Sequence, residues 1–157
     1  MKYTIYTDGS CRGNGQNKNN GGWAFLILDE NEEEFLRGSG GFLSTTNNRM
    51  ELMAMANGLE KATTFCPDFS EFEVYTDSAY IHNCYEQKWY KNWLRNGWIN
   101  SSKEPVKNRD LWERIIPYFD DENFSFYKVK AHSNNFYNNQ IDKMAVKAAQ
   151  KAEEVEK

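Results

Sequence analysis

Apolar and polar residues along this chain follow two different periods, one typical of strands and one typical of helices. Five segments are rich in β-branched and aromatic residues, and we predict a strand in each. They are residues 2–8, 23–28, 33–43, 71–76 and 124–130. The Gly- and Asn-rich stretch 9–22 and the acidic stretch 29–32 separate the first three strands as turns. Connections this short favour an antiparallel meander.

The remaining long segments show helical periodicity. The predicted helices cover residues 46–64, 78–86, 90–96, 108–119 and the chain from about 137 onward. In 46–64 apolar side chains occupy nearly every face, which predicts a helix that is buried on more than one side. We expect the helix over 108–119 to stop around Pro117. The last helix carries an apolar stripe, and its Lys- and Glu-rich final turns are expected to fray. The stripe consists of Ile141, Met144, Ala145, Ala148, Ala149 and Ala152.

The order of these elements predicts an α/β fold. Three strands, a helix, a strand, several helices, a strand and a final helix form a mixed five-stranded sheet, an antiparallel meander plus parallel strands, with helices on both faces. The 157 residues suffice for one domain with a sizeable core, so we predict a single domain over 1–157.

Bulk properties narrow the class of protein. No apolar run approaches the roughly 18 residues of a membrane span, and the first residues lack the pattern of a signal peptide. The three cysteines form no CxxC pair and only two histidines are present, which argues against a disulfide framework and a zinc site. We therefore expect a cytoplasmic protein that makes no membrane contact.

The net charge of −4 is unevenly distributed. Residues 87–114 contain seven basic and three acidic side chains, a balance of +4, which leaves −8 on the rest. Residues 87–98, here called the basic aromatic segment, contain no acid. The segment interleaves three cations with four aromatic residues: Lys88, Lys91 and Arg95 with Trp89, Tyr90, Trp93 and Trp98. Such a segment fits either a solvent-exposed helix whose aromatic residues pack on the protein core or a surface that binds a nucleic-acid backbone.

Four acids stand within or beside segments that otherwise have the composition of a core. They are Asp8 in YTIYTDGS, Glu51 in NNRMELMAMA, Asp77 in EVYTDS and Asp142 in NNQIDKMA. A buried carboxylate is costly unless something neutralises it. Divalent cations such as Mg²⁺ prefer oxygen ligands from a few carboxylates, so the acids indicate metal-assisted phosphate chemistry.

Three of these acids also have ordinary structural explanations. Asp8 precedes a glycine and fits a turn, Asp77 fits a helix N-cap, and Asp142 fits the first turns of a helix, where the macrodipole favours an acid. Glu51 is harder to explain in this way, because it interrupts a helix that is predicted to be buried. Each acid alone is weak evidence, and their combination is the stronger signal.

The motifs TDGSCRGN, TTNNRMEL, YTDS and NQIDKMA, in this order and spacing, closely resemble the type 1 ribonuclease H family. PVKNRDLW and the Trp-rich segment before it extend the similarity over almost the whole chain, and bacterial single-domain enzymes are the nearest match. The resemblance implies a ribonuclease H-like fold and a monomeric endonuclease that hydrolyses the RNA strand of RNA/DNA hybrids. It also implies that Asp8, Glu51, Asp77 and Asp142 hold two Mg²⁺ or Mn²⁺ ions and that cleavage leaves 5′-phosphate and 3′-hydroxyl ends.

The same resemblance assigns roles to other residues. His132 is expected to assist proton transfer to the leaving group or product release, although Ala131 and Ser133 depart from the usual neighbours. The remaining assignments concern substrate contacts. Cys11, Asn14, Asn47 and Asn48 match positions that contact the minor groove, and Lys88, Trp89, Lys91, Trp93 and Arg95 match the basic protrusion that holds the DNA strand. Thr46 and Arg49, near the same helix start as the asparagines, are further candidates for phosphate contacts. This protrusion is less cationic than in well-known members, and the asparagines also suit turns and helix caps.

Three other functions remain open at this point. A related resolvase or transposase would have a similar acidic site and would cut duplex DNA. A non-catalytic module that binds hybrids would use the same fold, although four intact acids argue against it. An acidic cation-binding structural protein would leave the basic aromatic segment unexplained. The Gly-rich stretch 9–22 lacks the GK[ST] ending of a phosphate-binding loop.

Overall fold

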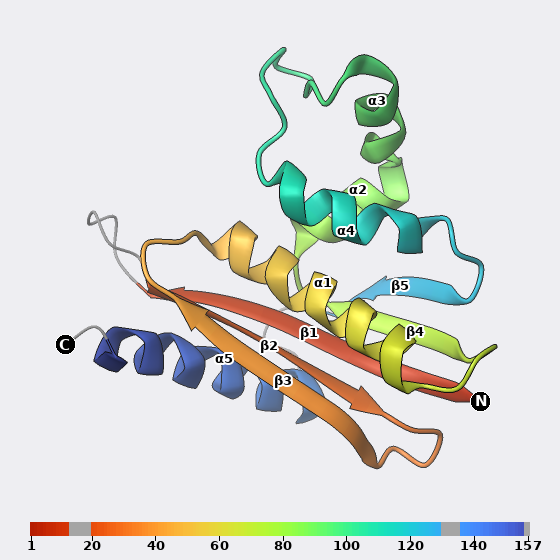
Figure 1. The fold of residues 1–157 in the computed structure, drawn as a ribbon, viewed down its shortest axis with the longest axis vertical. Coiled ribbons are helices and arrows are strands. Elements are labelled where there is room, and N and C mark those ends of the chain that lie inside the picture. Colours follow the sequence, from red (N-terminus) through yellow and green to blue (C-terminus); the bar gives the residue numbers. More distant parts are fainter. Residues whose placement is uncertain (13–19, 130–135, 156–157) are drawn as a thin grey trace.

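The computed structural model describes residues 1–12, 20–129 and 136–155, which form a five-stranded sheet with helices on both faces (Figure 1). The strands lie in the order β3-β2-β1-β4-β5. β1 and β3 pair with β2 in antiparallel fashion, whereas β4 pairs with β1 and β5 in parallel fashion. The predicted mixed sheet is therefore confirmed, including the meander of its first three strands.

The helices and strands follow the predicted order. They are β1 (Lys2–Arg12), β2 (Asn20–Leu28), β3 (Glu34–Phe42), α1 (Asn47–Phe65), β4 (Glu71–Thr76), α2 (Ala79–Gln87), α3 (Trp89–Asn96), α4 (Arg109–Phe119), β5 (Phe124–Lys128) and α5 (Phe136–Val155). None of the helices in the described part of the chain is long and apolar enough to cross a membrane.

The central strand β1 is longer than the sequence predicts. We expected it to end at Asp8, but its antiparallel pairing with β2 continues to Arg12. Its parallel pairing with β4 stops earlier, at Thr7. The prediction failed because Asp8–Gly9 has the composition of a turn, whereas the register with β2 keeps the backbone extended. Asp8 therefore lies inside β1, at the point where one of its two neighbouring strands ends.

The alternation of β1 side chains divides the core into two layers. Ile5 belongs to the large cluster on the α1 face, whereas Tyr6 packs on the α5 face with Ile141 and Ala145. α1 covers β1 and β2, and α5 lies across β1, β2 and β3 on the opposite face (Figure 1). Both long helices thus hold β1 rigidly between them.

Helices α2, α3 and α4 stand on the α1 side of the sheet, with α3 farthest from it (Figure 1). Aromatic packing holds them together. The Trp112 ring is fully buried and makes edge contacts with Tyr80 and Trp93, each at 5.4 Å between ring centroids. The Trp93 ring in turn lies 5.8 Å from that of Trp98. The basic aromatic segment is therefore anchored to the domain core through its tryptophans.

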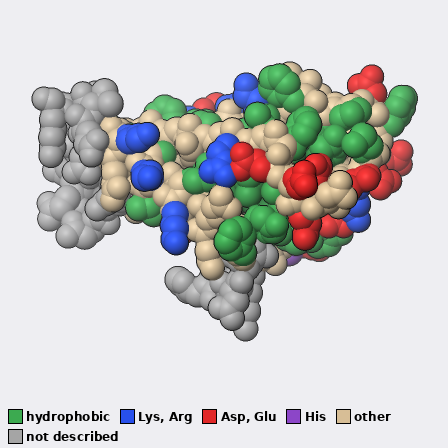
Figure 2. Space-filling view, turned by 90° about the horizontal axis from the view of Figure 1, so that it is seen from below, with side chains coloured by type: hydrophobic (Ala, Val, Ile, Leu, Met, Phe, Trp, Pro, Cys, Tyr) green, Lys and Arg blue, Asp and Glu red, His purple; other side chains and the backbone are tan. Residues whose placement is uncertain are grey.

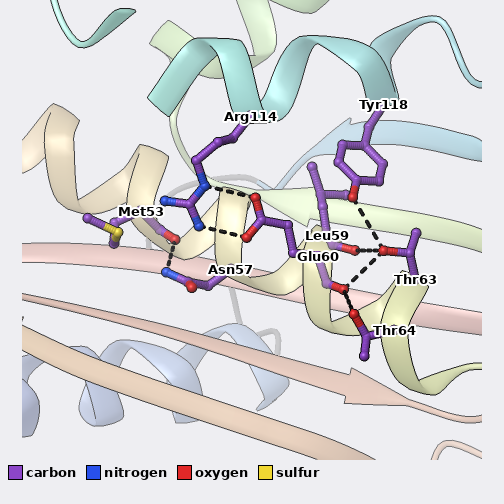
Figure 3. Close-up of polar contacts among 8 residues, drawn as sticks. All are labelled: Met53, Asn57, Leu59, Glu60, Thr63, Thr64, Arg114 and Tyr118. Atoms are coloured by element: carbon purple, nitrogen blue, oxygen red, sulfur yellow. Dashed lines mark hydrogen bonds and ion pairs between the residues drawn. The ribbon is translucent and has the colours of Figure 1, made fainter. Parts of the chain in front are cut away.

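Polar contacts join α4 to the outer side of α1 (Figure 3). The Arg114 guanidinium donates from Nε and Nη2 to the Glu60 carboxylate, at 2.8 Å in both cases. One turn further along, the Tyr118 and Thr63 hydroxyls are 3.3 Å apart. These contacts connect the helix that carries Glu51 to the helix that follows the basic aromatic segment.

Helix α4 continues past the proline that was expected to stop it. Pro117 lies inside the helix, which ends at Phe119. A proline lacks the backbone N–H of a helical hydrogen bond, but tertiary packing holds the last residues in place. The Phe119 ring is buried and packs edge-on against Phe126 of β5 at 5.0 Å. Packing at the helix end thus outweighs the local preference.

Candidate active site

Three of the four predicted acids come together at the centre of the sheet. Asp8, Glu51 and Asp77 each place a carboxylate oxygen so that all three oxygens lie within 4.8 Å of one another. The sheet register explains the pairing, because Thr7 of β1 lies beside Thr76 of β4 and each acid is the next residue. α1 then brings Glu51 over the same point.

Glu51 is held by the backbone of β1. The Gly9 N–H donates to Glu51 Oε1 at 2.9 Å. A Cβ on residue 9 would lie 2.3 Å from the backbone nitrogen of Glu51, so only glycine permits α1 to approach this closely. The glycine after Asp8 thus serves close packing and the hydrogen bond to Glu51, and the turn explanation for Asp8–Gly9 is wrong.

Asp77 does not cap the helix that follows it. Ser78 is the N-cap of α2, and its Oγ accepts from the Ile81 N–H at 3.2 Å. The Ser78 N–H donates to Thr76 Oγ1 at 3.1 Å, which fixes the backbone on both sides of Asp77. The Asp77 side chain is half-buried and faces the other acids. The N-cap explanation for this acid is therefore excluded.

Asp142 lies at the edge of the group. It is exposed on α5, and it lines a cleft of about 470 Å³ together with Asp8, Glu51 and Asp77. Its carboxyl group lies close enough to that of Asp8 to contribute to the raised pKa of Asp8. Asp142 is therefore brought to the same cleft as the others, but it is not one of the three acids within 4.8 Å of one another.

Two of the acids, Asp8 and Glu51, are buried without a compensating cation among the described side chains. Asp8 is 2% exposed and Glu51 is 4% exposed. Burial raises the pKa of both carboxyl groups, and the neighbouring negative charges, Asp77 among them, raise each pKa further. Asp8 Oδ2 and Glu51 Oε2 are buried and accept no hydrogen bond from the described residues. Unsatisfied carboxylate oxygens facing a cleft fit the hard oxygen ligands that Mg²⁺ and Mn²⁺ take, so the residues present suit a divalent metal site.

Some of the predicted substrate contacts border this cleft. Cys11, Asn47 and Asn48 line it together with the acids, and the Cys11 thiol lies 3.5 Å from the Thr45 carbonyl oxygen. Burial raises the pKa of this thiol, which favours its neutral form. Asn14 and His132 lie outside the described residues.

Two residues at the start of α1 have structural roles that were not predicted. Thr46 is the N-cap, and its Oγ1 accepts from the Arg49 N–H at 3.1 Å. The Arg49 guanidinium donates to both Asp110 oxygens, at 3.1 and 2.7 Å, and to Asn108 Oδ1 at 3.1 Å. This ion pair lowers the pKa of Asp110. Arg49, which we predicted as a phosphate contact, thus ties the start of α1 to the start of α4.

A second cavity of about 740 Å³ adjoins the acidic cleft, because Asn48 and Tyr80 line both. The basic aromatic segment contributes Trp89, Trp93 and Arg95 to its lining. Sequence reasoning missed further lining residues, namely Asn92 and Asn96 within this segment and Tyr80, Asn100, Ser101 and Lys107 outside it. These polar and aromatic residues belong to no recognisable sequence motif, and only the folded structure shows that they line one cavity.

The members of the basic aromatic segment are not equivalent. Trp93 is only 7% exposed, so its ring is mainly part of the core, whereas Trp89 is half-buried. Lys88 and Lys91 are exposed, and Lys88 adopts a left-handed backbone conformation (φ 57°) between α2 and α3. Arg95 donates to the Lys91 carbonyl and to Asn92 Oδ1, at 3.3 and 2.7 Å. All three predicted cations are exposed, but only Arg95 lines the cavity.

Known proteins resemble this chain over nearly its full length. A family model for RNase H matches residues 1–150. Ribonuclease H of Clostridium botulinum (strain Hall) is 43% identical over 148 residues, which are 94% of this chain and 95% of that protein. Ribonuclease H of Chlorobaculum parvum is 45% identical over 142 residues, 90% and 91% of the two chains. LC11-RNase H1, solved in complex with an RNA/DNA hybrid, is 25% identical with a TM-score of 0.68 and covers 96% of this chain and 98% of its own. With its mixed sheet and central acids, this chain belongs to the ribonuclease H family.

Proposed function

We propose that this protein is an endonuclease that hydrolyses the RNA strand of RNA/DNA hybrids with two bound divalent cations. The observation that carries the proposal is the group of three carboxylates within 4.8 Å, two of them buried, in a cleft beside a cavity of aromatic and basic residues. Relatives named ribonuclease H support the activity. The hybrid complex of LC11-RNase H1 supports the choice of substrate.

Asp8, Glu51 and Asp77 would hold the metal in the cleft, with Asp142 at the edge. When bound, Mg²⁺ or Mn²⁺ supplies an activated water for in-line attack and stabilises the leaving oxygen, which gives 5′-phosphate and 3′-hydroxyl ends. The protein keeps the ligands in place through the sheet register and the hydrogen bond from Gly9 to Glu51. The concentrated negative charge of the acids offsets the mutual repulsion of two cations.

The residues around the cleft suit recognition of a hybrid. A nuclease that cuts RNA in a hybrid must recognise the 2′-hydroxyl, and Cys11, Asn47 and Asn48 present small polar groups beside the acids. We assign Asn14 to the same role and His132 to proton delivery to the leaving oxygen. Thr46 and the basic aromatic segment are assigned to phosphates, the segment to those of the DNA strand.

We further propose that the protein acts as a cytoplasmic monomer and that residues 1–157 form one catalytic domain. The family model covers 1–150, and the two long helices share one sheet. Sedimentation velocity with and without hybrid measures the oligomeric state. A concentration-dependent dimer in the absence of hybrid would contradict the monomer.

The decisive experiment compares end-labelled RNA/DNA, RNA/RNA and DNA/DNA duplexes with Mg²⁺, Mn²⁺ or chelator. We expect cutting of the RNA strand of RNA/DNA only, no activity in chelator, and loss of at least about 10³-fold of the rate in Glu51→Gln. Asp68→Asn, at an exposed acid between α1 and β4 that lines neither the cleft nor the adjoining cavity, is the matched control. Cleavage of DNA/DNA would instead indicate a resolvase-like enzyme, and hybrid binding without cleavage would indicate a binding module.

A further inference from the structure

A groove of about 820 Å³ lies between β3 and the C-terminal half of α5. β3 is the edge strand of the sheet, separated from β1 by β2, so the groove is distinct from the acidic cleft. None of the residues that line the groove lines the cleft. The proposed nuclease activity therefore makes no use of it.

The floor of the groove consists of small and apolar residues. A Cβ on Gly41 would lie 2.3 Å from the Ala148 carbonyl oxygen, so the backbones of β3 and α5 approach closely here. Ser39 adds a second small residue, and Met144 and the exposed Phe42 add apolar surface. Small residues beside larger apolar ones leave a shallow channel in which another backbone can lie close to the sheet.

The groove has a cationic rim. Arg37, Lys147 and Lys151 line it, and its described lining contains no carboxylate; Arg37 is already ion-paired with Glu34 of its own strand, so the two lysines supply the open positive charge. Lys147 and Lys151 are one helical turn apart on the same face of α5, and neither forms an ion pair with another described residue. Figure 2 shows Lys and Arg side chains gathered at the α5 C-terminal end of this face and acidic side chains at its other end. In a chain of net charge −4, this rim is a local reversal of sign.

The groove also runs along an open strand edge. β3 pairs only with β2 among the described strands, so alternate backbone N–H and C=O groups of β3 point away from the sheet. Edges of this kind accept an added strand, where main-chain hydrogen bonds give affinity and alternate side chains give specificity.

We propose that this groove binds an extended acidic peptide segment of a partner protein. Its backbone follows β3, an apolar side chain lies on the floor near Met144, and its carboxylates meet Lys147 and Lys151. Nucleic acid fits less well, because the floor of the groove is apolar and takes an apolar side chain rather than a sugar-phosphate backbone. Charge complementarity and the strand edge thus favour the same occupant.

The test uses the whole chain and the fluorescein-labelled peptide Glu-Asp-Phe-Glu-Leu-Asp-Glu, measured by anisotropy at low salt. We expect saturable binding that weakens about tenfold or more in Lys147→Glu/Lys151→Glu and weakens when the peptide Phe is replaced by Ser. Lys61→Glu, at an exposed lysine of α1 outside the groove, serves as a charge-reversal control and should bind the peptide as wild type does. Hybrid cleavage by the double variant is expected to be unchanged, which separates this proposal from the proposed nuclease activity.

Three results would overturn the proposal. The first is the absence of saturable peptide binding, or an equal weakening in Lys61→Glu, since either means nonspecific charge attraction. The second is a flatter salt dependence of hybrid binding in the double variant, which would assign the groove to nucleic acid. The third is self-association that requires Lys147 and Lys151, which would make the acidic turn of a second copy the occupant.

Discussion

Replacing Asp8 with Asn should stabilise the metal-free protein while abolishing metal-dependent cleavage. Asp8 is buried beside Glu51 and Asp77, and among the described residues no cation pairs with it. Burial first, and then the charges of Glu51 and Asp77, raise the pKa of Asp8 above its ordinary value. Asn has nearly the same shape as the protonated acid, so it removes the electrostatic cost of this position and keeps the packing.

The size of the effect follows from proton linkage. An unfolded Asp has a pKa of about 3.9, and each pH unit between the unfolded and the raised folded pKa costs about 1.4 kcal/mol. The wild-type chain therefore loses stability as pH rises through this window, and at pH 7 the cost is at most about 4 kcal/mol. The Asp8→Asn variant avoids this cost, so its gain should be near zero at pH 4 and about 1–4 kcal/mol at pH 7, or roughly 2–16 °C in Tm.

Urea and thermal unfolding in chelator, between pH 4 and pH 8, measure this gain directly. Asp68→Asn, at an exposed acid, is the control and should change stability by less than about 0.5 kcal/mol at any pH. Adding Mg²⁺ should raise the stability of wild type more than that of Asp8→Asn, because a ligand stabilises the form that binds it. Destabilisation of Asp8→Asn at pH 7 in chelator, or a gain that does not vary with pH, would refute the reasoning.

The other predictions concern packing, surface charge and substrate. Gly9→Ala should lower the free energy of unfolding by about 3 kcal/mol, because its Cβ would meet the backbone of Glu51. Gly97→Ala, at a residue with φ 79° and open space around it, should lower the same free energy by only about 1 kcal/mol, and equal losses of the two variants in urea unfolding would contradict the close approach at Gly9. A double-mutant cycle on Glu60 and Arg114, whose side chains are 41% and 36% exposed, should give a coupling below about 1 kcal/mol, and a coupling above about 2 kcal/mol would show that solvent does not screen the pair. Replacing the three cations of the basic aromatic segment with Gln should weaken hybrid binding and reduce its salt slope by roughly one for each phosphate that is no longer neutralised, while an unchanged slope would leave the segment a structural role only.

The existence of each strand and helix could be predicted because half-buried elements leave a period in the sequence. Their ends could not, because ends depend on neighbours distant in the chain. Asp8–Gly9 looks like a turn until β2 is placed beside it, and pairing then continues to Arg12. Likewise Pro117 should end α4, but burial of Phe119 against β5 keeps the last turn helical.

The acids of the site could be found from their core-like surroundings and from the order of their motifs. The sequence did not predict which partners individual side chains contact. Arg49 and Asp110 are far apart in the chain, and no sequence pattern near either residue indicates that they form an ion pair. The burial of Trp93 could not be predicted either, because an aromatic residue between basic residues is compatible with a core and with a nucleic-acid-binding surface.

The scattered origin of the acids has a consequence for biosynthesis. Asp8 comes from the first strand and Asp142 from the last helix, so no fragment that emerges early from the ribosome contains the complete set. Parallel pairing of β1 with β4 closes a loop of about 70 residues, a slow step because the chain gives up its entropy before the two strands pair. The group of three carboxylates therefore forms only after β4 has paired with β1, and Asp142 joins the cleft last. The complete acidic cleft is thus present only in the finished domain.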